Sequence, residues 1–335
     1  MKKNAVLFLL IFASVAIYAQ NYKICFSGIG ACNTVDSVKV ENLTQCKSFI
    51  LSGKDTLHLT AEIIPVAMKL QNNTSGSGKK NVLSKYGKLA GMKYNFGERL
   101  KITGFSKGIY RTVVTLVPER DTTIVFNFVA CADADNNHYA VVQIGTQLWM
   151  AENLNTTKYS NGDSIIYYKE YKKKNSTNKS KHGLYYDCGN NPDNGKIYGK
   201  LYNWYAVHDS RKIAPKGWHV PTTEEWGLLT SYLGGESVAG GKLKATCSSF
   251  WQDPNSGATN ETGFTALPAG IVCENSKCYL GESENWWCST QCRTTVNSAT
   301  ECAWSREVLN NSCAVTKDEY LYKANGFSVR CVKDR

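Results

Sequence analysis

Hydrophobic and polar residues alternate with a period of two through the first third of the chain. Val38 and Val40 form one such pair, and Ile124, Phe126 and Phe128 form a clearer series. This alternation is typical of half-buried β-strands. Further apolar runs occur at 57–59, 63–68, 100–105 and 110–117. Roughly six to eight short strands in about 110 residues predict an all-β, sandwich-like domain at 20–131.

The pattern changes after a polar connector at 132–138. From residue 139 onward, short apolar runs such as 140–144 are separated by long polar loops. The closing run, 326–332, predicts a strand whose Phe327, Val329 and Cys331 side chains point inward. We therefore expect a second domain of mixed α and β structure at 139–335.

One helix in this second domain has clear start and stop signals. Thr222 and Glu225 have the spacing of a capping box, in which two otherwise unpaired backbone N–H groups are satisfied. The following residues Trp226, Leu229 and Leu233 share one helical face, and two glycines at 234–235 end the helix. Glutamates at this position are interpreted as helix-start residues rather than as a catalytic acid pair.

The connector contains acidic side chains at alternate positions. Asp133, Asp135 and Asn137 have the spacing of the first three ligands of some Ca²⁺ loops, but Ile144 stands where the twelfth-position carboxylate is needed. We interpret the segment as a polar turn, with a calcium site as the alternative. No cofactor is expected otherwise.

The first residues predict export. Lys2 and Lys3 precede fifteen uncharged, mostly apolar residues at 5–19, which is the layout of a secretory signal peptide cleaved between Ala19 and Gln20. No run reaches the about 20 apolar residues that a membrane-spanning helix needs. We expect an exported protein at the cell surface, in the extracellular space or in the periplasm.

Charge gives weaker information about partners. The chain has 39 basic and 28 acidic side chains, a net charge of +11. Its lysine-rich segment at 169–181 is interpreted as a solvated loop, the alternative being a patch for anionic polysaccharide or nucleic acid. An exported protein rarely meets nucleic acid, so no nucleic-acid partner is expected.

Thirteen cysteines fit an oxidising compartment, in which disulfides form and persist. Four lie before residue 135, an even set that can close within one domain, and nine lie after it. One of the nine is then free, paired with another chain, or paired across the domain boundary. Zinc held by Cys273, Cys278, Cys288 and Cys292 is the alternative to disulfides. The disulfide candidates are Cys273 and Cys278, which flank a predicted turn, together with Cys302, Cys313, Cys247 and Cys331.

Six sequence blocks stand out in the second domain. They are VVQIGTQLWMAENL at 141–154, GKLYNWY at 199–205, APKGWHVPT at 214–222, GFTALPAG at 263–270, WWCST at 286–290 and NGFSVRCV at 325–332. In sequence and in order these blocks resemble those of the Fibrobacter succinogenes major paralogous domain family, and the resemblance covers about residues 138–335. The resemblance implies a C-type-lectin-like fold, in which a helix packs on a small twisted sheet and long loops carry binding. It implies no substrate.

Motifs of catalysis are missing from the sequence. Neither a Gly-x-Ser-x-Gly nor a His-Glu-x-x-His sequence occurs, and His219 is interpreted as a hydrogen-bonded structural residue. Residues 220–226 also resemble a segment of formylglycine-generating enzymes, which need a copper-binding thiol pair near the chain end. Cys331 is alone in the final predicted strand, so we expect no enzyme activity of that kind.

Aromatic residues are the remaining candidates for binding. Tyr279, Trp286, Trp287 and Trp304 lie in a loop-rich stretch, where flat rings stack on sugars or anchor protein partners. For Trp286 and Trp287 the alternative is a place in the core. The Ca²⁺-dependent sugar motifs of C-type lectins do not occur in the sequence.

The sequence thus favours an exported, non-catalytic binding module for a glycan or a surface protein. Two alternatives remain: a structural or adhesive component of the bacterial envelope, and an enzyme related to formylglycine-generating enzymes. The oligomeric state and the ligand are left open.

Overall fold

The computed structural model describes residues 21–61, 90–169, 181–247, 249–273, 279–291 and 302–335. The predicted signal peptide, with its cleavage site at Ala19 and Gln20, lies outside the described residues. The predicted strand at 63–68 and most of the lysine-rich segment lie outside them as well.

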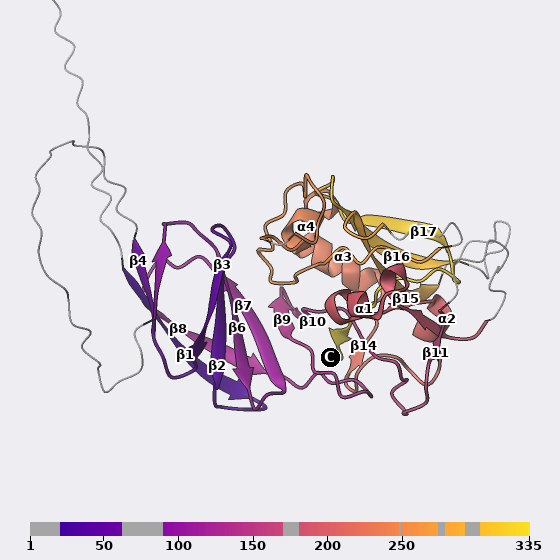
Figure 1. Ribbon diagram of the computed structural model, residues 1–335, viewed down its shortest axis with the longest axis horizontal. Helices are drawn as coiled ribbons and strands as arrows, with labels where there is room; N and C mark the ends of the chain where they lie inside the picture. Colours follow the sequence, from indigo (N-terminus) through magenta and orange to yellow (C-terminus); the bar gives the residue numbers. More distant parts are fainter. Residues whose placement is uncertain (1–20, 62–89, 170–180, 248, 274–278, 292–301) are drawn as a thin grey trace, which may run out of the picture.

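The first third of the chain folds into two facing β-sheets, which we call the N-terminal sandwich (Figure 1). One sheet has the strand order β5-β4-β1-β8, and β7-β6-β2-β3 form the other side. Alternate residues such as Ile24, Val40, Ile102 and Phe126 point between the sheets and are fully buried there. The strands are β1 (Tyr22–Gly30), β2 (Ser37–Asn42), β3 (Lys47–Ser52), β4 (Leu57–Ala61), β5 (Ala90–Tyr94), β6 (Leu100–Ser106), β7 (Tyr110–Leu116) and β8 (Thr122–Phe128).

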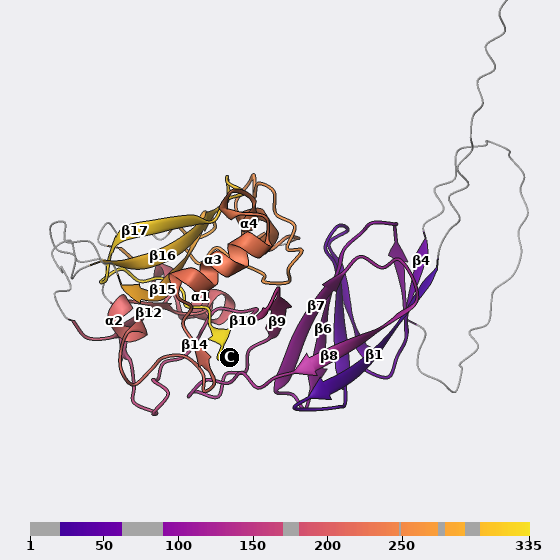
Figure 2. The same ribbon diagram turned by 180° about the vertical axis from the view of Figure 1, so that it is seen from behind.

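The remaining residues form what we call the C-terminal part, in which short strands and helices alternate with long loops (Figure 2). Its short strands are β9 (Val141–Ile144), β10 (Gln147–Met150), β11 (Ile166–Tyr167), β12 (Leu184–Tyr186), β13 (Leu201–Tyr202), β14 (Trp218–His219) and β18 (Val332–Lys333). Its longer strands, β15 (Ser283–Gln291), β16 (Cys302–Leu309) and β17 (Thr316–Tyr322), form one antiparallel sheet. Its helices are η1 (Cys188–Asn190), α1 (Pro192–Tyr198), α2 (Trp204–Val207), α3 (Thr223–Tyr232) and α4 (Glu236–Leu243).

Helix α3 is the helix that the capping box predicts. The Thr222 hydroxyl accepts a hydrogen bond from the Glu225 N–H at 3.2 Å, and the Glu225 carboxylate accepts one from the Thr222 N–H at 2.9 Å. Trp226 and Leu229 are wholly buried in the core of the C-terminal part. The glycines at 234–235, both with positive φ, follow the helix as predicted.

The closing segment differs from its prediction in one respect. Phe327, Val329 and Cys331 are wholly buried, as predicted. The residues between them, Ser328 and Arg330, are buried too. The prediction of one continuous strand over 326–332 is therefore wrong: residues 326–328 form only isolated bridges, to Val272, Tyr202 and Trp286, and regular pairing is confined to β18.

The connector folds as a polar turn. The Asp133 carboxylate accepts hydrogen bonds from the backbone N–H groups of Asp135 and Asn137, at 2.9 and 3.0 Å, and from the Tyr139 hydroxyl. Asp135 forms an ion pair with Lys158 at 3.1 Å. These contacts with the chain itself already engage both carboxylates.

One sheet crosses the boundary between the two parts. Its strand order is β14-β18-β10-β9-β7-β6-β2-β3, and the crossing point is a parallel pairing of β7 with β9. Val113 of β7 belongs to the core of the C-terminal part, next to Val142 of β9. The two parts are therefore joined through backbone hydrogen bonds and a shared core. Figures 1 and 2 both show β9 at the boundary, on the side that faces β7. Among the described residues, no helix has the length and hydrophobicity to cross a membrane.

Candidate functional site

The aromatic candidates divide into buried and accessible rings. Trp286 and Trp287 are both 0% exposed, and they contribute to different core clusters because they are neighbours on strand β15. The Trp287 indole donates a hydrogen bond to the Tyr202 carbonyl at 2.7 Å. These two rings are core residues and offer no face to a ligand. Tyr279 is 38% exposed, and Trp304 is half-buried beneath the Lys317 ammonium, 3.8 Å from its ring centroid.

His219 has the hydrogen-bonded environment that its interpretation requires. Its Nε2 lies 2.9 Å from Glu225 Oε1, and its Nδ1 lies 2.6 Å from Asp334. The hydrogen bond to Glu225, helped by the one to Asp334, raises the pKa of the imidazole. The residue therefore ties the start of α3 to the end of the chain.

The cysteines behave differently from a set that closes within each part. Cys46 of the N-terminal sandwich is bonded to Cys247 of the C-terminal part, across 201 residues of sequence. Cys25, Cys32 and Cys131 are free thiols, so the first four cysteines do not pair among themselves, and Cys46 pairs across the boundary instead.

The other disulfide candidates are placed as follows. Cys331 is a free, wholly buried thiol, and Cys313 is a free, half-buried one. Cys273 is half-buried, while Cys278 and the side chain of Cys302 lie outside the described residues. The pairing of Cys273 with Cys278 remains a prediction.

A groove opens where the two parts of the chain meet. It comprises two stretches of about 430 and 350 Å³ that share Lys39, Glu41, Lys101, Thr265 and Leu267. We call the continuous depression the interdomain groove. Its volume lies in the range of known ligand sites, which are about 300–1,000 Å³.

One wall of the interdomain groove is the outer face of the sandwich sheet. Inward residues of β2 and β6 fill the sandwich core, so their alternate neighbours necessarily point outward. Glu41 forms ion pairs with Lys39 at 2.8 Å and Lys101 at 3.3 Å. Burial acts to raise the pKa of the Glu41 carboxyl, but the two ammonium groups outweigh it and hold the pKa below its ordinary value. The wall also contains Phe105 and Arg111.

The opposite wall comes from residues far apart in sequence. Four of the six blocks described above supply it, because their loops meet at this edge of the C-terminal part. Glu152 in the first block joins the walls through an ion pair with Arg111 at 3.2 Å. The block residues that line the groove are Ala151, Glu152, Asn153, Gly199, Thr265, Leu267 and Arg330.

Beneath this wall lies a buried polar network centred on Asn153. Its side-chain oxygen accepts hydrogen bonds from Arg330 at 2.7 and 3.0 Å and from the Trp286 indole at 3.1 Å. Its amide donates to Glu284 at 2.8 Å. Burial raises the pKa of the Glu284 carboxyl to about 8 and lowers that of the Arg330 guanidinium to about 10. The network fixes the floor of the groove, because the Asn153 side chain forms hydrogen bonds with Arg330, Trp286 and Glu284 at once.

Thr265 has an unusual backbone conformation within the groove. Its φ is +58°, in the left-handed region that a β-branched residue seldom adopts. The Asn260 side chain holds it there by accepting from the Thr265 N–H at 2.9 Å and donating to its hydroxyl at 3.1 Å. Strained residues of this kind tend to occur at functional sites.

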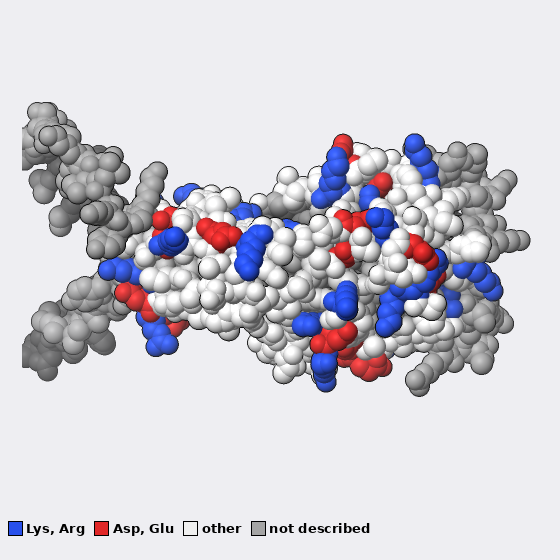
Figure 3. Space-filling model, turned by 90° about the horizontal axis from the view of Figure 1, so that it is seen from below, with Lys and Arg blue, Asp and Glu red and all other residues white. Residues whose placement is uncertain are grey.

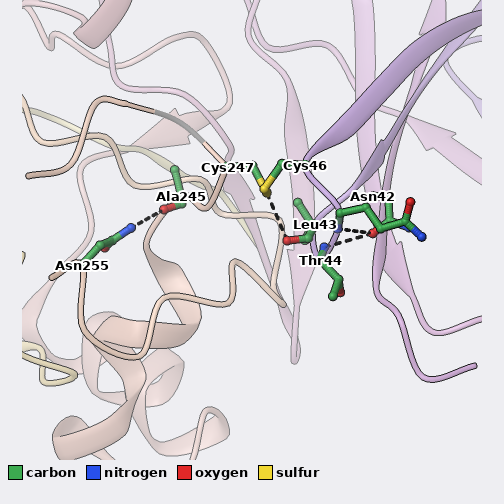
Figure 4. The surroundings of a disulfide bond; sticks show 8 residues. Asn42, Leu43, Thr44, Cys46, Ala245, Cys247 and Asn255 are labelled. Carbon is green, nitrogen blue, oxygen red and sulfur yellow. Dashed lines mark hydrogen bonds between the residues drawn. A yellow bond between two sulfur atoms is a disulfide. The ribbon is translucent and has the colours of Figure 1, made fainter. Parts of the chain in front are cut away.

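The Cys46–Cys247 disulfide, shown in Figure 4, links the two walls of the groove, and both of its cysteines line the 350 Å³ stretch. Cys247 Sγ lies 3.1 Å from the Leu43 carbonyl oxygen, and the Asn42 side chain accepts from the Thr44 N–H at 3.0 Å. Both cysteines of the disulfide are exposed to solvent. It therefore fixes the spacing of the two walls from outside the core.

Charge over the molecule is mixed. On the face in Figure 3, basic and acidic side chains are interspersed along both parts rather than gathered by sign. Within the described ranges, no group of three or more His, Cys, Asp or Glu side chains is arranged to hold a metal ion.

Sequence reasoning missed the interdomain groove. In the sequence, Lys39, Glu41 and Lys101 occupy the outward-facing positions of predicted strands. The β7–β9 pairing then places this outer face opposite four of the six blocks. The blocks contained one indication of a site. Their polar residues Asn153 and Arg330 stand among apolar residues in the sequence, which is typical of a buried polar network.

The comparison with protein families identifies the second half of the chain. The Fibrobacter succinogenes major domain matches residues 142–333, more than half of the chain. No curated protein and no solved structure matches this sequence. The N-terminal sandwich wall of the interdomain groove lies outside the matched range, whereas the opposite wall lies almost wholly within it. The chain belongs to the Fibrobacter succinogenes major domain family.

Proposed function

We propose that this protein is an exported, non-catalytic binding module that takes its ligand, a glycan or a surface protein, in the interdomain groove. The observation that carries the proposal is the convergence of four family blocks and a second sheet on one open groove. A site assembled from several distant segments on rigid elements is typical of ligand binding.

The charges in the groove support binding rather than catalysis. A general acid or base needs an accessible group whose pKa lies near the working pH. Both carboxylates of the groove are ion-paired, and Glu41 is held ionised by Lys39 and Lys101. The carboxyl with a strongly raised pKa, Glu284, is wholly buried below the surface.

The thiols buried in the core of the C-terminal part do not resemble activated nucleophiles. A reactive cysteine is accessible and has a lowered pKa. Cys131 and Cys331 share one core cluster with both side chains buried, and burial raises the pKa of each thiol well above its ordinary value. Burial likewise raises the pKa of Cys288 to about 12. These properties argue against chemistry like that of formylglycine-generating enzymes.

Export and the lectin-like fold belong to the same proposal. The charged and apolar pattern of residues 1–19 supports export, and the exposed Cys46–Cys247 disulfide fits an oxidising compartment. The capped helix α3 beside the β15–β16–β17 sheet supports a C-type-lectin-like fold.

Binding by residues 20–335 to an array of glycans and to an array of purified bacterial surface proteins tests the proposal. Specific, saturable binding on either array is expected. The absence of binding on both would overturn it. Stoichiometric copper in the purified protein, with the Cys131 and Cys331 thiols as ligands, would support the enzyme alternative instead.

A further inference from the structure

We infer that the ligand of the interdomain groove is a segment of a glycan chain, and that the N-terminal sandwich supplies the specificity. This inference rests on the proposed binding function and deepens it by naming the ligand class. Three features of the groove lead to it: its two adjoining stretches, its pattern of polar groups and the aromatic ring beside them.

The groove is composed of two adjoining stretches. They share five residues, and together their linings include Glu152 and both cysteines of the Cys46–Cys247 disulfide. Adjoining stretches of this kind suit a ligand made of linked units, such as a glycan chain.

The polar groups of the sandwich wall alternate between donors and acceptors. Lys39, Glu41 and Lys101 form a row in which one carboxylate lies between two ammonium groups. Arg111 and Glu152 form a second pair across the groove. A sugar hydroxyl is both a donor and an acceptor, so each pair can engage one or two hydroxyls without leaving a charge uncompensated.

Peptide binding by strand addition is the alternative at this wall. β2, β6 and β7 are paired on both sides, whereas β3 is the edge strand of the sheet and its Lys47 and Ser48 line the groove. An extended peptide commonly binds by adding a strand to such an edge. The peptide array in the test below therefore distinguishes the two ligand classes.

An apolar ring completes the sandwich wall. Phe105 lies on β6 opposite Arg111 of β7 and is half-buried at the groove. Aromatic rings pack against the C–H faces of sugars while the polar groups beside them bind hydroxyls. Since this wall lies outside the matched family range, it is the part that distinguishes this chain's ligand.

The test compares variants of the full mature chain, residues 20–335, on the same glycan array and on an array of unstructured peptides. Glu41→Gln and Phe105→Ala change the sandwich wall, and Glu282→Gln and Phe96→Ala are their matched controls at exposed positions outside the groove. Thermal unfolding of every variant establishes that it is folded. We expect at least tenfold weaker glycan binding for the two groove variants and no change for the controls.

The outcomes separate this inference from the proposed function. Glycan binding that both groove variants retain would overturn the assigned site while leaving a binding function in place. Binding to peptides or surface proteins without glycan binding would overturn the ligand class alone. The failure of all arrays would overturn the proposed function, and the inference with it.

Discussion

Asn153 shows how much of this fold depends on single polar residues. It is 7% exposed, and its side chain bonds to Arg330, Trp286 and Glu284, which come from different segments. Buried polar groups are stable only when they are paired, and in such a network the loss of one member leaves several others unpaired. The floor of the interdomain groove therefore depends on this amide.

Replacement of Asn153 by Ala is expected to destabilise the protein by about 3 kcal/mol, because it leaves the Arg330 and Trp286 donors buried without their acceptor. Urea unfolding followed by tryptophan fluorescence measures the change. Asn161→Ala, at an exposed turn, is the control and should change stability by less than about 0.5 kcal/mol. Equal effects of the two substitutions would contradict the role of the network.

Glu284 makes the stability depend on pH. Its pKa is raised from 4.5 to about 8 by burial, so between these values the folded protein holds a proton that the unfolded chain releases. The stabilisation is complete below about pH 4.5 and is lost as the pH rises toward 8.

Wild-type protein should therefore lose stability relative to Glu284→Gln between pH 5 and 8, by an amount on the order of 2–4 kcal/mol. Unfolding free energies of both proteins at several pH values give the difference directly. The two proteins are compared by how steeply the unfolding free energy changes with pH. Absolute values also differ, because the glutamine amide of the variant alters the hydrogen bonds with Asn153 and Ala269 at every pH. Parallel curves would show that Glu284 does not titrate in this range.

Among the elements, α3 is the one whose formation is most local. Its start is set by Thr222 and Glu225, and its buried face by Trp226 and Leu229. The same Glu225 carboxylate also lies 2.9 Å from His219, so the helix start is tied to the last residues of the chain through Asp334. A local signal thus fixes a contact between distant parts.

Thr222→Ala removes the side-chain acceptor at the N-cap and is expected to cost about 1 kcal/mol. Ser231→Ala, at an exposed position of the same helix, serves as the matched control and should be nearly neutral. Chemical denaturation of the three proteins checks the prediction. A neutral Thr222→Ala would mean that tertiary packing alone holds the helix start.

The whole molecule behaves as two parts made into one by three kinds of link. Strands β7 and β9 share backbone hydrogen bonds, Arg111 and Glu152 form an ion pair, and Cys46 is bonded to Cys247. The interdomain groove exists only because these links hold its walls together. Its geometry is therefore a property of the assembled chain and of neither part alone.

The Cys46→Ser/Cys247→Ser double variant should be destabilised by about 2–4 kcal/mol, because the disulfide closes a long loop and so restricts the unfolded chain. It should still unfold in a single transition, since the β7–β9 pairing and the Val113 contact remain. Calorimetry measures both quantities, with Cys25→Ser, an exposed free thiol, as the control. Two separate transitions would show that the disulfide alone couples the parts.

Local patterns in the sequence determined the elements with the simplest surroundings. The alternation around Val40 and Phe126 predicted strands with the correct inward faces, and the capping box predicted the start of α3. Both patterns depend on residues within a few positions of one another along the chain. The interactions that stabilise these elements can therefore be identified from the segment alone. The six blocks placed the second half in its family for the same reason, as an ordered series of local motifs.

Tertiary structure alone decided where binding groups meet. The sequence left open whether Trp286 and Trp287 bind a ligand or fill the core. Both are buried, because β15 runs through the interior. The pairing of β7 with β9 brings the two walls of the interdomain groove together. It also brings Cys46 close to Cys247, although the two cysteines are 201 residues apart in sequence. Such contacts depend on how whole sheets pack, and alternation along one strand carries no information about which surface will face it.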